Sequence, residues 1–122
     1  MQGRFMFRIW CVNKSQWEEG RIYIDNNGWI YDDLHRVKEE THIIQQCTGL
    51  TDCSGNLIYE GDVVRFGLEE NDIGVIEWDE GRCRFIIDEK LNNSVSDFDN
   101  FYSKELEVIG NICEHEFFKQ EE

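Results

Sequence analysis

Apolar side chains recur at every second position in several stretches of this chain, the period of strands that bury one face. Phe5, Phe7 and Ile9 take alternate positions near the N-terminus, which predicts a strand that turns them inward. Residues 21–25 and 29–31 then flank an Asn-Gly pair, whose tolerance of positive φ favours a two-residue hairpin turn. The beginning of the chain therefore predicts a strand followed by a hairpin.

The alternation returns more clearly in the second half of the chain. Residues 73–78 and 83–87 predict another hairpin, whose Asp-Glu-Gly turn places Gly81 in the left-handed conformation. Residues 105–113 predict a closing strand, in which Gly110 marks a bend or a bulge.

Three segments lack the strand pattern. Residues 32–40 are mostly polar, with Leu34 and Val37 three positions apart, and predict one short helix. Residues 91–103 are rich in Asn, Ser and Asp and predict a loop. Residues 115–122 predict at most one helical turn.

Short strands separated by Gly-centred turns predict a mainly β protein with little helix. We expect residues 49–122 to form a small, partly open, acidic barrel of the SH3-like type, with residues 1–48 as an additional strand and hairpin layer. The two parts are expected to form one compact unit. One continuous core is expected, with a fully buried Trp78 whose replacement by Ala costs about 3–5 kcal/mol. Its expected members are Val63, Trp78, Phe85, Ile87 and Val108.

The middle of the chain holds a distinctive series of turns and strands. Asp52 to Gly55 predicts a tight turn, because Asp and Ser bond their own backbone and Gly accepts positive φ. Residues 57–59 predict a short strand, residues 60–62 a second turn, and residues 63–66 a return to the sheet.

This series resembles the YopX family of small phage and prophage proteins. The likeness includes Tyr59-Glu60-Gly61-Asp62-Val63-Val64, the basic and aromatic strand at residues 4–10, and residues 107–114. Members often have Lys where this chain has Cys53. The resemblance implies a phage or prophage setting and transfers no functional residue.

The charge of −14 is unevenly spread. Residues 1–50 hold seven acids and six bases, whereas residues 51–122 hold 19 acids and six bases. Such a field repels nucleic acid and attracts basic protein surfaces, although acidic excess also serves solubility alone. The carboxylates expected to bind a partner are those of the predicted turns and loops: Glu69, Glu70, Asp72, Asp79, Glu80, Asp97 and Asp99.

Chemical motifs are missing from the sequence. Cys113 and His115 lie two positions apart and Cys47 and Cys53 flank the tight turn, but neither arrangement has the paired spacing of a zinc site. We expect the five cysteines to be reduced thiols, with no zinc and no other cofactor bound. No nucleophile elbow and no phosphate-binding glycine loop occurs, so we expect no enzyme.

These observations predict a non-enzymatic phage-type protein that acts by binding another protein. The sequence shows neither a long apolar run nor a signal-peptide pattern, which favours a cytoplasmic place in the bacterial host. The sharper hypothesis is inhibition of a host nucleic-acid-handling defence enzyme, a CRISPR effector or restriction nuclease, by acidic mimicry of DNA or RNA. A structural or replication accessory protein is the alternative. Direct binding of nucleic acid is not expected, and a metal-dependent enzyme is a marginal third class.

Overall fold

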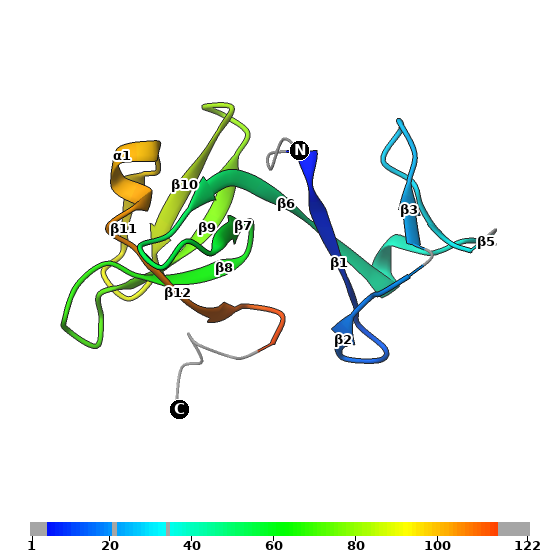
Figure 1. Ribbon diagram of the computed structural model, residues 1–122, viewed down its shortest axis with the longest axis horizontal. Helices are drawn as coiled ribbons and strands as arrows, with labels where there is room; N and C mark the ends of the chain where they lie inside the picture. Colours follow the sequence, from blue (N-terminus) through cyan, green and yellow to red (C-terminus); the bar gives the residue numbers. More distant parts are fainter. Residues whose placement is uncertain (1–4, 21, 34, 115–122) are drawn as a thin grey trace.

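The computed structural model describes residues 5–20, 22–33 and 35–114. Its strands form three antiparallel sheets, with the orders β2-β1-β6-β7, β11-β10-β9-β8-β12 and β3-β4-β5 (Figure 1). The strands are β1 (Phe7–Cys11), β2 (Gln16–Trp17), β3 (Ile22–Ile24), β4 (Ile30–Asp32), β5 (His35–Arg36), β6 (His42–Thr51), β7 (Leu57–Tyr59), β8 (Asp62–Arg65), β9 (Ile73–Asp79), β10 (Arg84–Glu89), β11 (Ser94–Asp97) and β12 (Glu107–Asn111). The mainly β prediction is confirmed.

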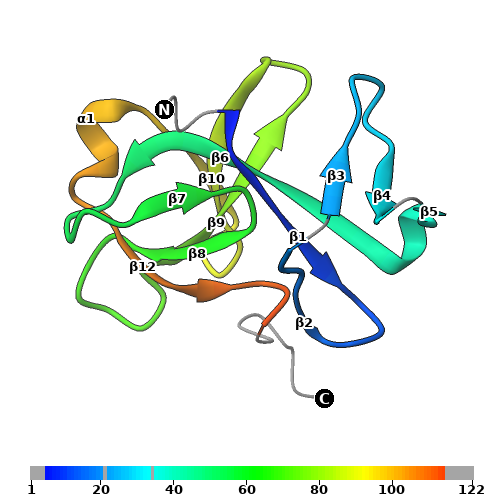
Figure 2. The same cartoon turned by 45° about the vertical axis from the view of Figure 1, so that its right-hand side comes forward.

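The molecule has two ends joined by one long strand. The five-stranded sheet curls into a half-barrel at one end, and the small β3-β4-β5 sheet stands at the other (Figure 2). β6 runs ten residues between them and pairs with β1 and then β7. β6 therefore continues across the expected boundary between the two parts of the chain, residues 1–48 and 49–122.

The hydrophobic core lies on both faces of the half-barrel sheet. Neighbouring residues of a strand point to opposite faces, so Val63 and Val64 are both fully buried but belong to different clusters. Val64 packs in the larger cluster with four further fully buried residues, and Val63 in the smaller one with Ile73 and Val75. The larger cluster is Ile58, Val64, Ile76, Ile87 and Leu106. The prediction of one continuous core is thus wrong.

Three aromatic residues expected in the interior are exposed. Trp78 is 44% exposed and lies edge-on against the half-buried Phe85, with 5.1 Å between the ring centroids. Its replacement therefore removes much less buried area than the sequence suggested. Phe5 and Phe7 are also exposed, whereas Ile9 is buried as predicted. Alternation identifies the two faces of a strand, but only the neighbouring sheet decides which face is covered.

Local predictions succeed where turn chemistry decides the conformation. The hairpin around Gly28, the tight turn at Asp52, and the bulge beside Gly110 are confirmed. The turn of the first hairpin has three residues, 26–28, and not two, between the bonded Asp25 and Trp29, and of the Asn-Gly pair Gly28 has the positive φ. In the β9–β10 turn, however, the residue with positive φ is Cys83 and not Gly81.

Two segments differ from their sequence predictions. The expected helix at residues 32–40 is replaced by β5 and a 3-10 turn at Glu39–Thr41. The expected loop at residues 91–103 contains β11 and the one-turn helix α1 (Asn100–Ser103). Phe98 and Tyr102 from this segment pack on the larger core cluster, so tertiary contacts order a polar stretch. The turn predicted at residues 115–122 lies outside the described residues. Among the described residues, no helix is long and apolar enough to cross a membrane.

Gly61 and Gly55 provide a matched pair for testing the turns. Both have positive φ, but a Cβ on Gly55 meets open space, whereas a Cβ on Gly61 lies 2.3 Å from Nε2 of Gln45. We expect Gly55→Ala to destabilise the protein by about 1 kcal/mol through backbone strain. Gly61→Ala should cost about 2 kcal/mol more, because the buried Gln45 side chain must shift.

Urea-induced unfolding measures the free energy of unfolding of each variant. The comparison requires that the slope of this free energy against urea concentration is the same as in the wild type. Equal losses for the two variants would show that Gln45 yields without cost.

Candidate functional site

Three of the predicted partner-binding carboxylates lie together in the loop that joins β8 to β9. Glu69 and Glu70 are exposed and follow Leu68, a residue that is 99% exposed. Asp72 is half-buried and has a different function. Its Oδ2 accepts a hydrogen bond from the backbone N–H of Glu69 at 3.1 Å, and its own N–H donates to the Glu69 carbonyl at 3.0 Å. Asp72 therefore fixes the loop that presents the other two acids.

The remaining predicted carboxylates lie elsewhere. Asp79 and Glu80 are at the far end of β9, about 20 Å from the β8–β9 loop at the rise of an extended strand. Asp79 pairs with Arg82 at 3.4 Å, and Asp97 pairs with Arg84 at 2.7 Å. Asp99 accepts a hydrogen bond from the Tyr102 N–H and caps α1.

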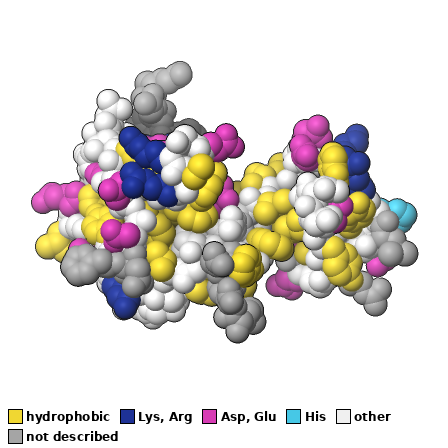
Figure 3. Space-filling model, turned by 90° about the horizontal axis from the view of Figure 1, so that it is seen from above, with side chains coloured by type: hydrophobic (Ala, Val, Ile, Leu, Met, Phe, Trp, Pro, Cys, Tyr) yellow, Lys and Arg dark blue, Asp and Glu magenta, His cyan; other side chains and the backbone are white. Residues whose placement is uncertain are grey.

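The acids therefore do not form one continuous surface. Figure 3 shows Asp and Glu side chains at several separate places, with Lys and Arg between them on the larger lobe. Only the β8–β9 loop combines neighbouring exposed acids with an exposed apolar side chain among the predicted positions.

A buried polar network joins the half-barrel to the sheet of β1 and β6. The carboxylate of Asp62, which is 2% exposed, accepts hydrogen bonds from Arg8, from Asn111 Nδ2 at 3.0 Å and from the Tyr59 N–H at 2.7 Å. Asn111 also exchanges two hydrogen bonds with Gln45, at 2.7 and 3.1 Å. One network thereby connects β1, β6, β8 and β12.

Two aromatic rings hold Arg8 in place. Its guanidinium carbon lies 4.3 Å from the centroid of the Trp17 ring and 4.2 Å from that of Tyr59. Cation–π contacts of this kind favour a charged guanidinium that has lost part of its water. The guanidinium of Arg8 is thus engaged within the fold, by Asp62 and the two rings.

The two buried aspartates have opposite pKa shifts. Burial raises the pKa of Asp62, and the donors from Tyr59, Asn111 and Arg8 only partly offset it. Burial also raises the pKa of Asp52, but hydrogen bonds from the N–H groups of Val108, Asn56 and Ser54 outweigh it, so the net pKa falls below 3.8. Asp52 thus acts as an ionised organiser of its turn.

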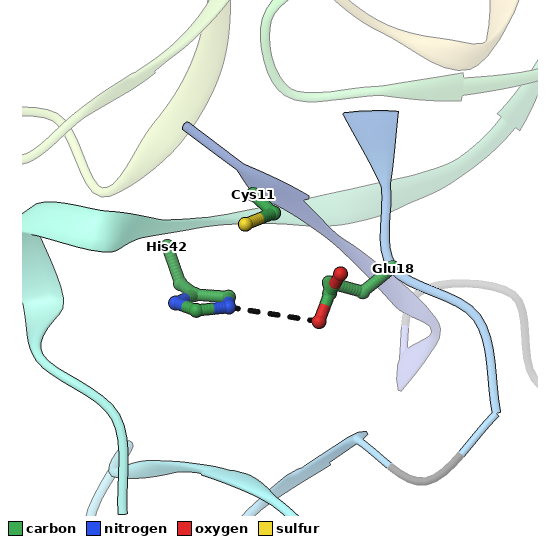
Figure 4. A group of neighbouring side chains, drawn as sticks. All are labelled: Cys11, Glu18 and His42. Carbon is green, nitrogen blue, oxygen red and sulfur yellow. Dashed lines mark ion pairs between the residues drawn. The ribbon is translucent and has the colours of Figure 1, made fainter. Parts of the chain in front are cut away.

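A second group of polar side chains gathers where β1, β2 and β6 meet. The Sγ of Cys11, a carboxylate oxygen of Glu18 and a ring nitrogen of His42 all lie within 4.8 Å of one another. His42 Nε2 is 3.6 Å from Glu18 Oε2 (Figure 4). Cys11 is 3% exposed, and the side chains of His42 and Glu18 are 9% and 7% exposed. These are residue types that bind transition metals.

Sequence reasoning found neither cluster. Residues 11, 18 and 42 do not have the close spacing of metal ligands in a sequence. The expectation that no zinc binds therefore rested on the cysteines at positions 47, 53 and 113. Asp62 belongs to the turn predicted at residues 60–62, a pattern that gives no sign of its burial. The one signal in the sequence is the alternation of Arg8 with Ile9 along the strand. It indicates that the two side chains lie on opposite faces, but it does not indicate that Arg8 contacts Asp62.

All five cysteines are free thiols. Cys11 and Cys47 are buried and Cys53 and Cys83 exposed, so their accessibility to solvent differs widely.

The fold and the buried network define a small β protein of three antiparallel sheets built around one Gly-Asp turn. The chain belongs to the YopX family, since the family model described as YopX protein matches residues 7–116. This confirms the resemblance seen in the sequence.

A solved structure shares the fold. The crystal structure of protein EF1440 from Enterococcus faecalis superimposes with a TM-score of 0.58 and 23% sequence identity, covering 88% of this chain and 92% of that one. No curated protein matches the sequence. The comparisons therefore give the family and the fold.

We expect Asp62→Asn to destabilise the protein by about 1–3 kcal/mol, because the amide nitrogen of Asn cannot accept a hydrogen bond and leaves one of the buried donors around it, such as the Tyr59 N–H, unsatisfied. Asp97→Asn is the control, since it removes an exposed ion pair and should cost less than about 1 kcal/mol.

The pKa of Asp62 also predicts the pH dependence. Because the pKa of Asp62 is higher in the folded protein, this carboxyl is more often protonated in the folded than in the unfolded chain at pH values above its ordinary pKa of 3.8. The stability contributed by Asp62 therefore falls as the pH rises through its folded pKa. The difference in unfolding free energy between wild type and Asp62→Asn should narrow with rising pH. A difference that widens would mean that attraction to Arg8 outweighs burial.

Proposed function

We propose that this YopX-family protein acts, without catalysis, by binding a basic protein surface through its β8–β9 loop. The observation that carries the proposal is the combination of Leu68, 99% exposed, with the neighbouring exposed carboxylates of Glu69 and Glu70. An apolar side chain beside acids is suited to a basic surface that has an apolar depression.

The loop is prepared for binding by its own hydrogen bonds. Besides the Asp72 contacts, the Phe66 N–H donates to the Asp72 carbonyl at 2.9 Å, and Asn92 Nδ2 donates to the Asn71 carbonyl at 3.1 Å. A Cβ on Gly67 would lie 2.2 Å from Asp72 Oδ2, so any other residue there would displace the carboxylate that fixes the loop. A rigid loop loses little entropy on binding.

The energies are compatible with a specific contact. Burying a Leu side chain contributes about 1.5–3 kcal/mol. The net charge of −14 speeds the encounter with a basic partner and disfavours acidic ones.

As partner we propose a host defence enzyme that handles nucleic acid, such as a CRISPR effector or restriction nuclease. Its channel is lined by Arg and Lys and accepts phosphates, which the carboxylates would replace. The loop supports mimicry of a short stretch only, because the other predicted acids lie at the far end of β9, pair with an arginine or cap α1. Inhibition would occur in the cytoplasm of the bacterial host.

The pairing of Asp79 and Asp97 with arginines supports an alternative. In it, the acidity outside the loop serves solubility, and the protein is a structural or replication accessory of a phage.

The test uses a partner captured from host lysate at low salt and eluted at moderate salt. Glu69→Lys/Glu70→Lys should weaken its binding at least about tenfold, a change of about 1.4 kcal/mol. The reversal should also reduce the salt dependence of binding, because exposed charge pairs are screened by salt. Leu68→Ala should raise the dissociation rate. Nucleic acid bound by the partner should compete with the wild-type protein.

Glu39→Lys/Glu40→Lys is the matched control, since it makes the same charge change at exposed residues of the 3-10 turn. If both double variants bind equally well, the β8–β9 loop is not the contact. A captured partner that binds no nucleic acid would favour the accessory function. Asp72 is left intact because its replacement would disturb the loop itself.

A further inference from the structure

We propose that Cys11, Glu18 and His42 bind one zinc ion. Bonds of about 2.3 Å to sulfur and 2.0–2.2 Å to nitrogen and oxygen place a tetrahedral nitrogen and oxygen roughly 3.3–3.5 Å apart and the sulfur roughly 3.5–3.7 Å from each. The 3.6 Å between His42 Nε2 and Glu18 Oε2 is only slightly longer than the first of these separations. All three ligand atoms lie within 4.8 Å of one another, so only a small movement of the Cys11 side chain is needed to bring its sulfur to bonding distance. In Figure 4 the three side chains converge from separate parts of the chain.

Strand register brings these residues to one face of the sheet. Cys11 ends β1 and is the register partner of His42, which begins β6. Glu18 follows β2, and its N–H donates to the Ile9 carbonyl at 2.8 Å, which places it opposite a residue two positions from Cys11. Positions two apart share a face, and residues that are opposite across a ladder do so too. The ligand set is therefore a consequence of backbone pairing.

A hydrogen bond outside the cluster orients the imidazole. The hydroxyl of Thr41 donates to the Lys38 carbonyl at 2.7 Å and therefore accepts from His42 Nδ1–H, at 2.8 Å. His42 Nε2 then presents a lone pair to a carboxylate oxygen, and two acceptors facing each other require a proton or a cation between them. Metal-binding histidines are commonly held in this way by a partner on the other nitrogen.

The donor set favours zinc over other common cations. A thiolate, an imidazole and one carboxylate oxygen suit Zn²⁺, whereas Mg²⁺ and Ca²⁺ prefer oxygen ligands alone. The second oxygen of Glu18 is engaged by Lys14 at 3.2 Å, which leaves one oxygen for the ion. Three protein ligands leave the fourth position of the ion to water.

The site is independent of the proposed partner-binding loop. A zinc ion would join the end of β1, the segment after β2 and the start of β6. This inference goes beyond protein binding, and the two can fail separately.

The test begins with tag-free wild-type protein freed of metal under reducing conditions and titrated with Co²⁺. We expect one Co²⁺ per chain, with a near-ultraviolet thiolate-to-cobalt band, and displacement of the cobalt by Zn²⁺. Cys53→Ser and Cys83→Ser, which change exposed thiols, should leave the band unchanged. Thermal unfolding should shift upward when Zn²⁺ is added to the metal-free protein.

Cys11→Ser should abolish the band, and His42→Gln should lower the Co²⁺ affinity at least about a hundredfold. Thr41→Val, which removes only the orienting hydroxyl, should lower it about 10–100-fold. The proposal is overturned if wild-type protein binds no Co²⁺ and Zn²⁺ leaves its unfolding unchanged, since the cluster is then an ion pair of His42 with Glu18 only. It is equally overturned if the band disappears in Cys53→Ser or Cys83→Ser, or persists in Cys11→Ser. If Cys11→Ser does not fold, the wild-type titration together with the Co²⁺ affinity of His42→Gln still decides whether this cluster binds the ion.

Discussion

The buried carboxylate of Asp62 is the interaction on which the arrangement of the sheets depends. It accepts hydrogen bonds from β1, from β12 and from Tyr59 at the end of β7, and through Asn111 it reaches Gln45 of β6. A carboxylate removed from water must find such partners, because an unpaired buried charge is strongly destabilising. The positions of four strands are therefore mutually dependent, and a side chain at the neighbouring Gly61 would displace Gln45, a member of the same network.

Asp52 and Asp62 show that position in the hydrogen-bond network, and not burial alone, determines the state of an acid. Both are at most 3% exposed. Asp52 receives three backbone N–H groups and has a lowered pKa, whereas burial dominates at Asp62 and raises its pKa. One carboxylate organises a turn and reaches across to Val108 in β12, while the other joins two sheets.

The acidic excess is thus divided among different tasks. Some carboxylates organise turns, some pair with arginines at the surface, and Glu69 and Glu70 stand exposed beside Leu68. Net charge describes the long-range field but not the place of contact. At the beginning of β6, a thiol, an imidazole and a carboxylate converge without any excess of charge. The protein therefore offers two chemically distinct candidate sites.

The sequence by itself determined the longer strands, several of their turns and the family, because local alternation and the conformational demands of Gly and Asp act over a few residues. It also marked the Glu69–Asp72 segment as acidic. Only the tertiary structure decided that Trp78 is exposed, that Arg8 meets Asp62, and that Cys11, Glu18 and His42 share a face. Each of these depends on which distant strand becomes the neighbour and in what register, and that choice is made by the packing of the whole chain.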